Sequence, residues 1–304
     1  MKSFIGMPSR LPGRLPQCSP RSSSYTPAIL SLFLMTACST PVPRPTGAAK
    51  DYADAKDQFG KARYDRALTF TGGFVRGEPG DYTQRGRVLR AVILSGEING
   101  FKELAEAYSK GAEVTKNPQW KAEYSRLRHD NLQYATSRSL ALGELTHALT
   151  QGTTLPKEVT LEAPYPKVEG PMMITQLSRV KDGGWIEAGD QEGAATDAQR
   201  MGIENALADL VRGDRAKARS QMDAGPVKVD GAEFGLFLGQ ELLTGAGTFD
   251  KKHLHDPAKV RALCAEADTV SKATTALLKA NHDPDKEKRL KKLQDDLKST
   301  LKSA

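Results

Sequence analysis

Apolar side chains recur every three or four positions along most of the chain after residue 50. This spacing places them on one face of an α-helix, whereas a half-buried strand would alternate with a period of two. Two helices also have clear starts, because Asp256-Pro257 and Asp283-Pro284 each place a capping aspartate before a proline suited to the first turn. The pattern predicts helices over residues 51–62, 118–150, 194–212, 231–243, 257–280 and 284–302.

Small and aromatic residues recur in a fixed order within these helices. The segment Ala62-Arg63-Tyr64-Asp65-Arg66-Ala67 places a small residue, an aromatic ring and an alanine where two helices would meet. The small residues allow close approach, and the ring fills the crevice between the helices. The segment resembles the turn-and-helix signature of tetratricopeptide repeats. The resemblance implies stacked helical hairpins with a concave surface that binds peptides or partner proteins.

Two further copies of this pattern are predicted. The second carries Phe101, Leu104, Tyr108 and Gly111 on one helix, after a short helix over about residues 86–94. The third has its turn at Gly213-Asp214 and continues with Arg215, Ala218 and Met222.

The expected fold class is therefore mostly all-α: a repeat-like solenoid of helical hairpins with an irregular Pro/Gly-rich insertion. An unrelated helical bundle is the alternative, because small-large spacing arises in any helical hairpin. We expect a TPR-like N-terminal helical region over residues 51–152, the insertion over 153–193 and a C-terminal helical region over 194–304.

The insertion is rich in prolines that exclude one continuous helix. Residues 158–163 (EVTLEA) alternate and predict a short strand, and Asp182-Gly183 predicts a turn, so at most a small hairpin is expected there.

The last helix has a narrow leucine stripe and many basic residues. We expect it to cap the solenoid by packing its leucines on the preceding helix, and the alternative is an amphipathic arm that meets a partner or a lipid surface. The stripe consists of Leu290, Leu293, Leu297 and Leu301.

The N-terminal segment has the pattern of a targeting signal. Basic residues precede an apolar run of about ten residues, which is too short to span a bilayer. The run ends in Leu34-Met35-Thr36-Ala37-Cys38, which resembles the signal of bacterial lipoproteins. The resemblance implies a signal peptide over residues 1–37, lipidation of Cys38 and, with Ser39 next to it, delivery to the outer membrane facing the periplasm. A plain secreted protein cleaved after Ala37 is the alternative.

Residues 38–50 are Pro-rich and predict a tether between the membrane and the folded part. The formal net charge of +7 owes four basic side chains to the leader, which has no acidic residue. Without the leader, the basic residues exceed the acidic ones by only three, and no nucleic-acid-binding motif is present, so no nucleic-acid partner is expected.

Candidate chemistry is sparse. His253 and His255 beside Asp256 form the one histidine cluster, but ligands two residues apart do not align on a helix, and Asp256 suits a helix cap better. The Gly-rich segment 70–80 lacks the lysine of a phosphate-binding loop and is expected to be a flexible connection. Cys264 is expected to be a buried apolar residue. We predict no cofactor, no metal and no catalytic residue.

Aromatic side chains offer the best candidates for partner binding. Trp185 follows Gly183-Gly184 in the insertion, and Trp120 lies near the start of a long helix, so both are candidate contact residues. Tyr124 and Tyr134 are expected to pack in the core. The charged residues Lys102, Glu103 and Glu106 are interpreted as surface charge.

The functional hypothesis is a lipid-anchored scaffold that binds protein partners in a cell-envelope assembly. The alternative is a periplasmic hydrolase or a peptidoglycan- or glycan-binding lipoprotein. A hydrolase would require a nucleophile and base or a carboxylate pair in one cleft, and no sequence motif marks one.

Overall fold

The computed structural model describes residues 46–150, 155–167, 174–184 and 187–304. These residues belong to one compact unit, Arg44–Ala304. The predicted signal peptide, Cys38 and most of the predicted tether lie outside the described residues, and so does Trp185.

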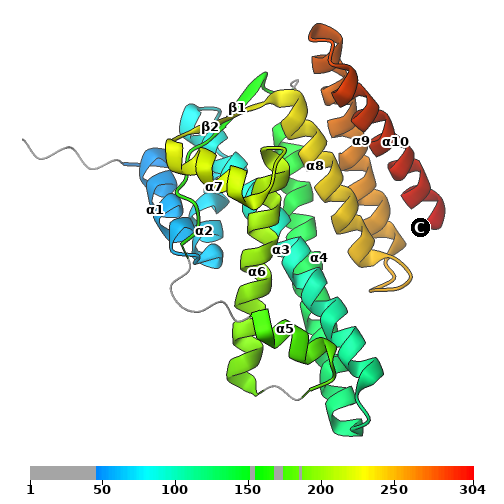
Figure 1. The fold of residues 1–304 in the computed structure, drawn as a ribbon. Helices are drawn as coiled ribbons and strands as arrows, with labels where there is room; N and C mark the ends of the chain where they lie inside the picture. Colours follow the sequence, from blue (N-terminus) through cyan, green and yellow to red (C-terminus); the bar gives the residue numbers. More distant parts are fainter. Residues whose placement is uncertain (1–45, 151–154, 168–173, 185–186) are drawn as a thin grey trace, which may run out of the picture. The chain divides into compact units, whose positions relative to one another are not determined.

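The described part of the chain is mostly α-helical, which confirms the predicted fold class (Figure 1). Its strands are short and form one two-stranded antiparallel sheet. In chain order the elements are α1 (Ala48–Gly60), α2 (Tyr64–Thr71), the 3-10 helix η1 (Gly72–Phe74), α3 (Asp81–Val114), α4 (Pro118–Thr150), β1 (Glu158–Leu161), α5 (Ile174–Lys181), α6 (Ala188–Leu210), α7 (Arg215–Ala224), β2 (Val227–Asp230), α8 (Gly231–Ala246), the 3-10 helix η2 (Gly247–Phe249), α9 (Pro257–Ala280) and α10 (Pro284–Ser303).

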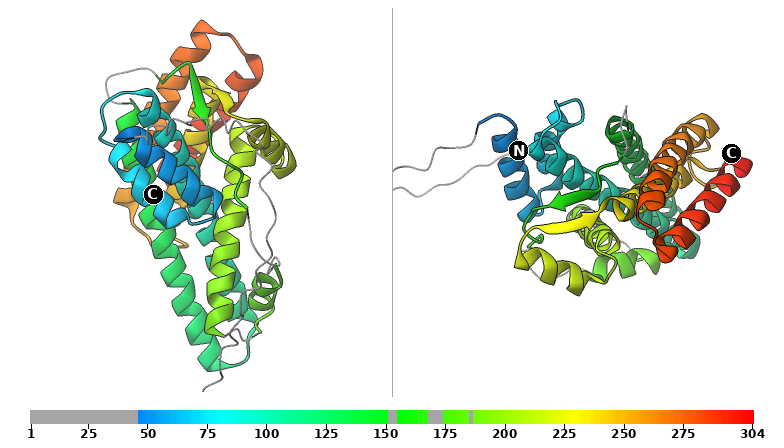
Figure 2. Two further views of the ribbon diagram at one scale, coloured as in Figure 1. Left: turned by 90° about the vertical axis from the view of Figure 1, so that its left-hand side faces the viewer. Right: turned by 90° about the horizontal axis from the view of Figure 1, so that it is seen from above.

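The long helix α3 organises the packing. It lies against α4 and α6 along much of its length, and it also contacts α1, α2, α5 and α8 (Figures 1 and 2). Strict solenoid stacking would pair each hairpin with its neighbours in sequence only. Because α3 contacts helices of both halves of the chain, the solenoid arrangement remains a prediction.

The buried apolar side chains form two clusters. The larger one extends from α1 to α10, and the smaller one surrounds the second half of α3, the start of α4 and α5. Leu104 and Tyr108 belong to the smaller cluster, where Tyr108 packs against Tyr124 with ring centroids 5.9 Å apart. The predicted burial of Phe101, Leu104 and Tyr108 is confirmed.

The predicted second helical hairpin is wrong, because α3 continues through residues 86–111 without a turn. Glycines on α3 and α6 have a packing role instead. A Cβ atom at Gly96 would collide with Ile203, one at Gly100 with the carbonyl oxygen of Ala198, and one at Gly202 with the carbonyl oxygen of Gly96. These glycines therefore let the backbones of α3 and α6 approach closely at their crossing.

The first and third hairpins have the predicted form. Ala62 joins α1 to α2 with φ of 54°, a left-handed conformation that favours glycine. Tyr64 and Ala67 are buried in that hairpin, as are Ala218 and Met222 after the turn at Gly213-Asp214. Helical hairpins of this kind occur in many helical folds, so the tetratricopeptide-like repeat stays a prediction.

The insertion is more ordered than predicted. Strand β1 forms where the alternation indicated it, but its partner is β2, with Glu158 opposite Asp230 and Leu161 opposite Val227. The described residues of the insertion therefore form no hairpin of their own, which lies within the prediction of at most a small one. The same region also contains α5, and α6 begins at residue 188, six residues before the predicted start. Pairing between segments this far apart leaves no local sequence signal.

The predicted helix starts and the burial of the last helix are confirmed. The side chains of Asp256 and Asp283 accept hydrogen bonds from backbone N–H groups in the first turns of α9 and α10. Leu290, Leu293 and Leu297 are buried against α8 and α9, whereas Leu301 is 41% exposed. The packing favours the capping role of α10.

The structure differs from two further predictions, the burial of Tyr134 and the flexibility of the Gly-rich segment 70–80. Tyr134 is 56% exposed and stacks on Phe101, so the expectation that it packs in the core is wrong. The Gly-rich segment is held in place, because the guanidinium of Arg87 donates hydrogen bonds to the carbonyl oxygens of Phe74, Val75 and Gly77. Its backbone carbonyl oxygens accept hydrogen bonds from a cationic side chain, whereas a phosphate-binding loop would donate backbone N–H groups to an anion.

Candidate functional site

A cleft of about 700 Å³ lies between α3, α6, the start of α7 and α8. Helix α3 contributes a polar stripe of four residues at helical spacing, which starts at Asn99 and ends at Glu106. Most of the lining residues are polar, with more acidic than basic side chains. It consists of Asn99, Lys102, Glu103, Glu106, Asn205, Ala208, Asp209, Gly213, Asp214, Arg215, Gln240, Glu241 and Thr244.

A second cavity of about 290 Å³ lies beside the first, between α6, α8 and α10. The two cavities share Asp209, Gln240 and Glu241 as lining residues. The second one also has an apolar part, formed by Leu236, Phe237 and Leu293, and basic residues from α10, Arg289 and Lys292. A ligand segment that fills the cleft can therefore continue into a partly apolar space.

Glu241 is the most unusual residue of the site. It is only 4% exposed, and its Oε2 accepts a hydrogen bond of 2.9 Å from Nδ2 of Asn99. Burial, together with the nearby carboxylate of Asp209, raises the pKa of Glu241 to about 8. Among the described residues, no Lys, Arg or His nitrogen lies within 4.0 Å of its carboxylate. The side chain is therefore mostly protonated at neutral pH in the free protein.

The basic residues nearest to this site are already engaged. Arg215 donates from Nε to Oδ1 of Asn205 at 2.9 Å, and its Nη1 lies 3.5 Å from the carboxylate of Glu204. Arg289 pairs with Glu233, with Nη1 to Oε1 at 2.7 Å. Neither guanidinium is therefore available to neutralise Glu241.

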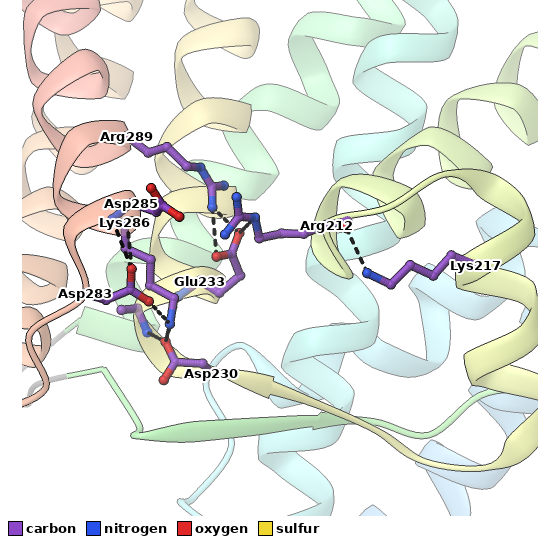
Figure 3. Close-up of polar contacts among 9 residues, drawn as sticks. Arg212, Lys217, Asp230, Glu233, Asp283, Asp285, Lys286 and Arg289 are labelled. Atoms are coloured by element: carbon purple, nitrogen blue, oxygen red, sulfur yellow. Dashed lines mark hydrogen bonds and ion pairs between the residues drawn. The ribbon is translucent and has the colours of Figure 1, made fainter.

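Ion pairs fix α10 beside the second cavity (Figure 3). Arg289 of α10 and Arg212, which follows α6, approach Glu233 of α8 from two sides, with the more distant Arg212 Nε at 3.8 Å from Oε1. Lys286 lies between Asp230 and Asp283, with Nζ 3.1 Å and 3.2 Å from their carboxylates. This network joins the start of α8 to α10 and to the end of α6, so it stabilises the wall of the cavity.

A second buried carboxylate, Glu97, lies elsewhere in the helix packing and has a different environment. It is fully buried on α3 and pairs with Arg138 of α4, whose Nε lies 2.5 Å from Oε2. Arg138 also contacts Asp65, and Gln199 of α6 donates to Oε1 of Glu97 at 3.3 Å. Burial raises the pKa of Glu97 to about 7, although Arg138 opposes this change. Because Glu97 has a guanidinium partner and borders neither cavity, we assign it a structural role in joining α2, α3, α4 and α6.

The residues predicted from sequence as partner-binding or reactive lie apart from the cleft or outside the described residues. Cys38 and Trp185 cannot be placed. Trp120 is half-buried in the first turn of α4, where its N–H is capped by Asn117 Oδ1 at 3.4 Å. Cys264 is buried as predicted, and burial raises the pKa of its thiol to about 11. In the histidine cluster, His253 pairs with Asp250 at 2.7 Å, and Asp256 caps α9.

The cleft itself was missed at the sequence level. The sequence predicts Lys102, Glu103 and Glu106 as surface charge, and only the fold shows that this helix face borders a cavity. One signal existed for Glu241, which lies between Leu238 and Leu242 in a helix that is otherwise nearly apolar. A carboxylate in such a helix is either paired or functional.

In the part of the chain that the structure describes, no group of three or more His, Cys, Asp or Glu side chains could hold a metal ion. None of the helices found there has the length and apolar character needed to cross a membrane. Comparison of the chain with protein-family models, with curated proteins and with solved structures finds no match.

Proposed function

We propose that the protein is a lipid-anchored helical scaffold that binds a segment of a partner protein in the cleft between α3, α6 and α8. In this proposal Cys38 carries the lipid, residues 38–50 form the tether, and the folded part faces the periplasm, with the outer membrane as the expected location. The signal-like sequence before Cys38 supports the anchor. The cleft supports the binding role.

The observation that carries the binding role is the size and lining of the cleft. A volume of about 700 Å³, continued by about 290 Å³, is large enough for several side chains of a partner. The lining is polar and charged, as is common where a surface exchanges partners instead of forming a permanent apolar interface. Trp120 and Trp185 remain candidate contacts outside the cleft.

The alternative of a periplasmic hydrolase acting on peptidoglycan gains one supporting observation. Glu241 and Asp209 border the same two cavities, and Glu241 is mostly protonated at neutral pH. Burial also raises the pKa of Asp209. Two carboxyl groups around one cavity are the groups that acid-catalysed glycoside hydrolysis uses. Release of soluble fragments from purified peptidoglycan by the wild type, and its loss in Glu241→Gln, would favour this alternative.

The scaffold proposal is tested by filling the cleft. Tagged protein is crosslinked in intact cells and purified, with wild type compared with Glu106→Trp, which places a large side chain at the cleft. The matched control is Glu113→Trp, two turns further along α3 at an exposed position that borders neither cavity. A crosslinked partner should be lost with Glu106→Trp and kept with Glu113→Trp. Equal recovery from both variants would contradict a binding role of the cleft.

A further inference from the structure

The cleft is lined by one buried carboxyl group, that of Glu241, which has no positively charged partner among the described residues. Glu241 has one hydrogen bond, from a neutral amide, and no cationic partner among the described residues. An ionised carboxylate in that position is costly unless a cation accompanies it, so the free protein keeps the group protonated. The second lining carboxylate, Asp209, adds negative charge to the same space.

The groups that face Glu241 from the surrounding helices do not supply this cation. Helix α3 presents Asn99 and Lys102 along with two glutamates, and α6 presents Asn205 and Asp209. The start of α7 presents Asp214 and Arg215, and α10 presents Arg289 and Lys292. Arg215 and Arg289 bind other acids. Lys102 favours the ionised form of Glu241 electrostatically, but burial and Asp209 outweigh it and the pKa of Glu241 stays raised. The lining as a whole keeps an excess of acidic groups.

We propose that the cleft binds a basic side chain, a lysine or an arginine, of a partner protein segment, with its ammonium or guanidinium group at Glu241. This inference rests on the proposed scaffold function and names the chemistry of the segment that is bound. The aliphatic stem of such a side chain fits the apolar part of the second cavity, beside Leu236 and Phe237, because Glu241 borders both cavities.

Binding of the cation should be coupled to the loss of a proton from Glu241. The ionised form pairs with the ligand, whereas the protonated form predominates in the free protein at neutral pH. Near pH 7 each bound side chain should therefore release up to one proton to the buffer, and about one pH unit above the pKa of Glu241 the release should nearly vanish. Proton release distinguishes pairing at Glu241 from attraction to exposed acidic residues, which are already ionised at pH 7.

The test is isothermal titration calorimetry of the full mature chain with a capped pentapeptide that has one central lysine. Titrations in two buffers with different ionisation enthalpies measure the protons released. The same peptide with norleucine in place of lysine keeps the apolar stem without the charge, and free spermidine tests a small polyamine as the source of the cation. The protein variants are Glu241→Gln and, as the control with the same chemical substitution at an exposed position, Glu113→Gln.

We expect the lysine peptide to bind with proton release, and the norleucine peptide to bind at least about tenfold more weakly, since losing one partner of a buried charge pair has effects of this size or larger. Glu241→Gln should weaken binding by a similar factor and abolish proton release, while Glu113→Gln should leave both unchanged. Proton release is measured on the wild-type protein alone, so the test remains valid even if Glu241→Gln does not fold.

Three results would overturn the assignment: equal binding of the lysine and norleucine peptides, unchanged binding by Glu241→Gln, or binding of spermidine without binding of the peptide. Its failure is distinguishable from failure of the scaffold proposal. If the peptide test fails while Glu106→Trp still removes a crosslinked partner, the cleft binds a partner by other chemistry.

Discussion

Asn99 of α3 donates a hydrogen bond of 2.9 Å to Glu241 of α8, although 142 residues separate the two in sequence. The bond joins helices from the two halves of the chain at the wall of the cleft. The cleft therefore requires α3, α6 and α8 to be packed together, and neither half of the chain contains it alone. Any change that loosens α6 or α8 from α3 should affect the cleft as well as stability.

The burial of Glu241 should make the protein less stable as the pH rises. Its pKa is about 8 in the folded protein and near 4.5 when unfolded, so between these values the folded state holds a proton that the unfolded state has lost. The free energy of unfolding then falls with rising pH, by at most ~1.4 kcal/mol per pH unit for one such group. Above the folded pKa the contribution of Glu241 no longer changes.

Glu241→Gln should remove this part of the pH dependence and should be more stable than wild type at alkaline pH. Glu97, with a pKa of about 7, contributes in the same direction and stays in both proteins, so the slope should shrink and not vanish. Urea denaturation at about pH 5, 7 and 9 measures the difference, with Glu113→Gln as control. Parallel curves for Glu241→Gln and wild type would mean that Glu241 is ionised throughout.

The close crossing of α3 and α6 predicts a penalty for any side chain at Gly202. A Cβ atom there would collide with the carbonyl oxygen of Gly96, and backbone cannot yield as a flexible side chain can. Gly202→Ala should lower the free energy of unfolding by about 1–3 kcal/mol despite the better helix propensity of alanine. Gly247→Ala is the control, because its Cβ meets no atom within 4 Å and φ is −61°. Equal melting temperatures of Gly202→Ala and Gly247→Ala would contradict the close approach of α3 and α6 at Gly202.

Helix α10 should be required for stability because it buries three leucines. Each buried leucine contributes roughly 1.5–3 kcal/mol, and the pair between Arg289 and Glu233 adds to the attachment. Deleting residues 284–304 should lower the melting temperature strongly and expose apolar surface to a dye such as ANS. An unchanged melting temperature would instead support the interpretation of α10 as a detachable arm.

The anchor is tested separately from the folded part. Cys38→Ser removes the thiol that would accept the lipid, so the protein should move from the membrane fraction to the soluble periplasmic fraction or accumulate as uncleaved precursor. Fractionation with a carbonate wash and a mobility comparison on gels give the answer. A cleaved variant that stays as membrane-bound as wild type would contradict lipidation at Cys38.

Local features of the fold could be predicted from the sequence, and contacts between distant segments could not. The Asp-Pro helix starts, the buried stripe of Leu290, Leu293 and Leu297 and the strand β1 follow from patterns within a few residues. The prediction of a hairpin within residues 86–111 is wrong because spacing within one helix does not show where the helix ends. The role of Gly96 and Gly100 becomes visible only with the approach of α6. The same holds for the pairing of β1 with β2, which depends on the whole intervening fold.

The candidate site shows this limit most clearly. Its polar residues on α3 are ordinary surface residues by every local criterion, and Glu241 is, with Glu233, one of two charged residues in the mostly apolar helix α8. They become a site only when α3, α6 and α8 enclose a common space. Helix–helix packing of this kind is decided by side-chain fit over many turns and leaves no short motif.

The most direct test of the account is photo-crosslinking from inside the cleft in living cells. Benzoylphenylalanine is introduced at Glu106, which borders the cleft, and at Glu113, which is also exposed on α3 but borders neither cavity. The account predicts a discrete crosslinked product from position 106 and none from position 113, with a basic segment of the partner at the attachment point. Matching products from both positions, or a product from position 113 alone, would contradict a partner-binding role of this cleft.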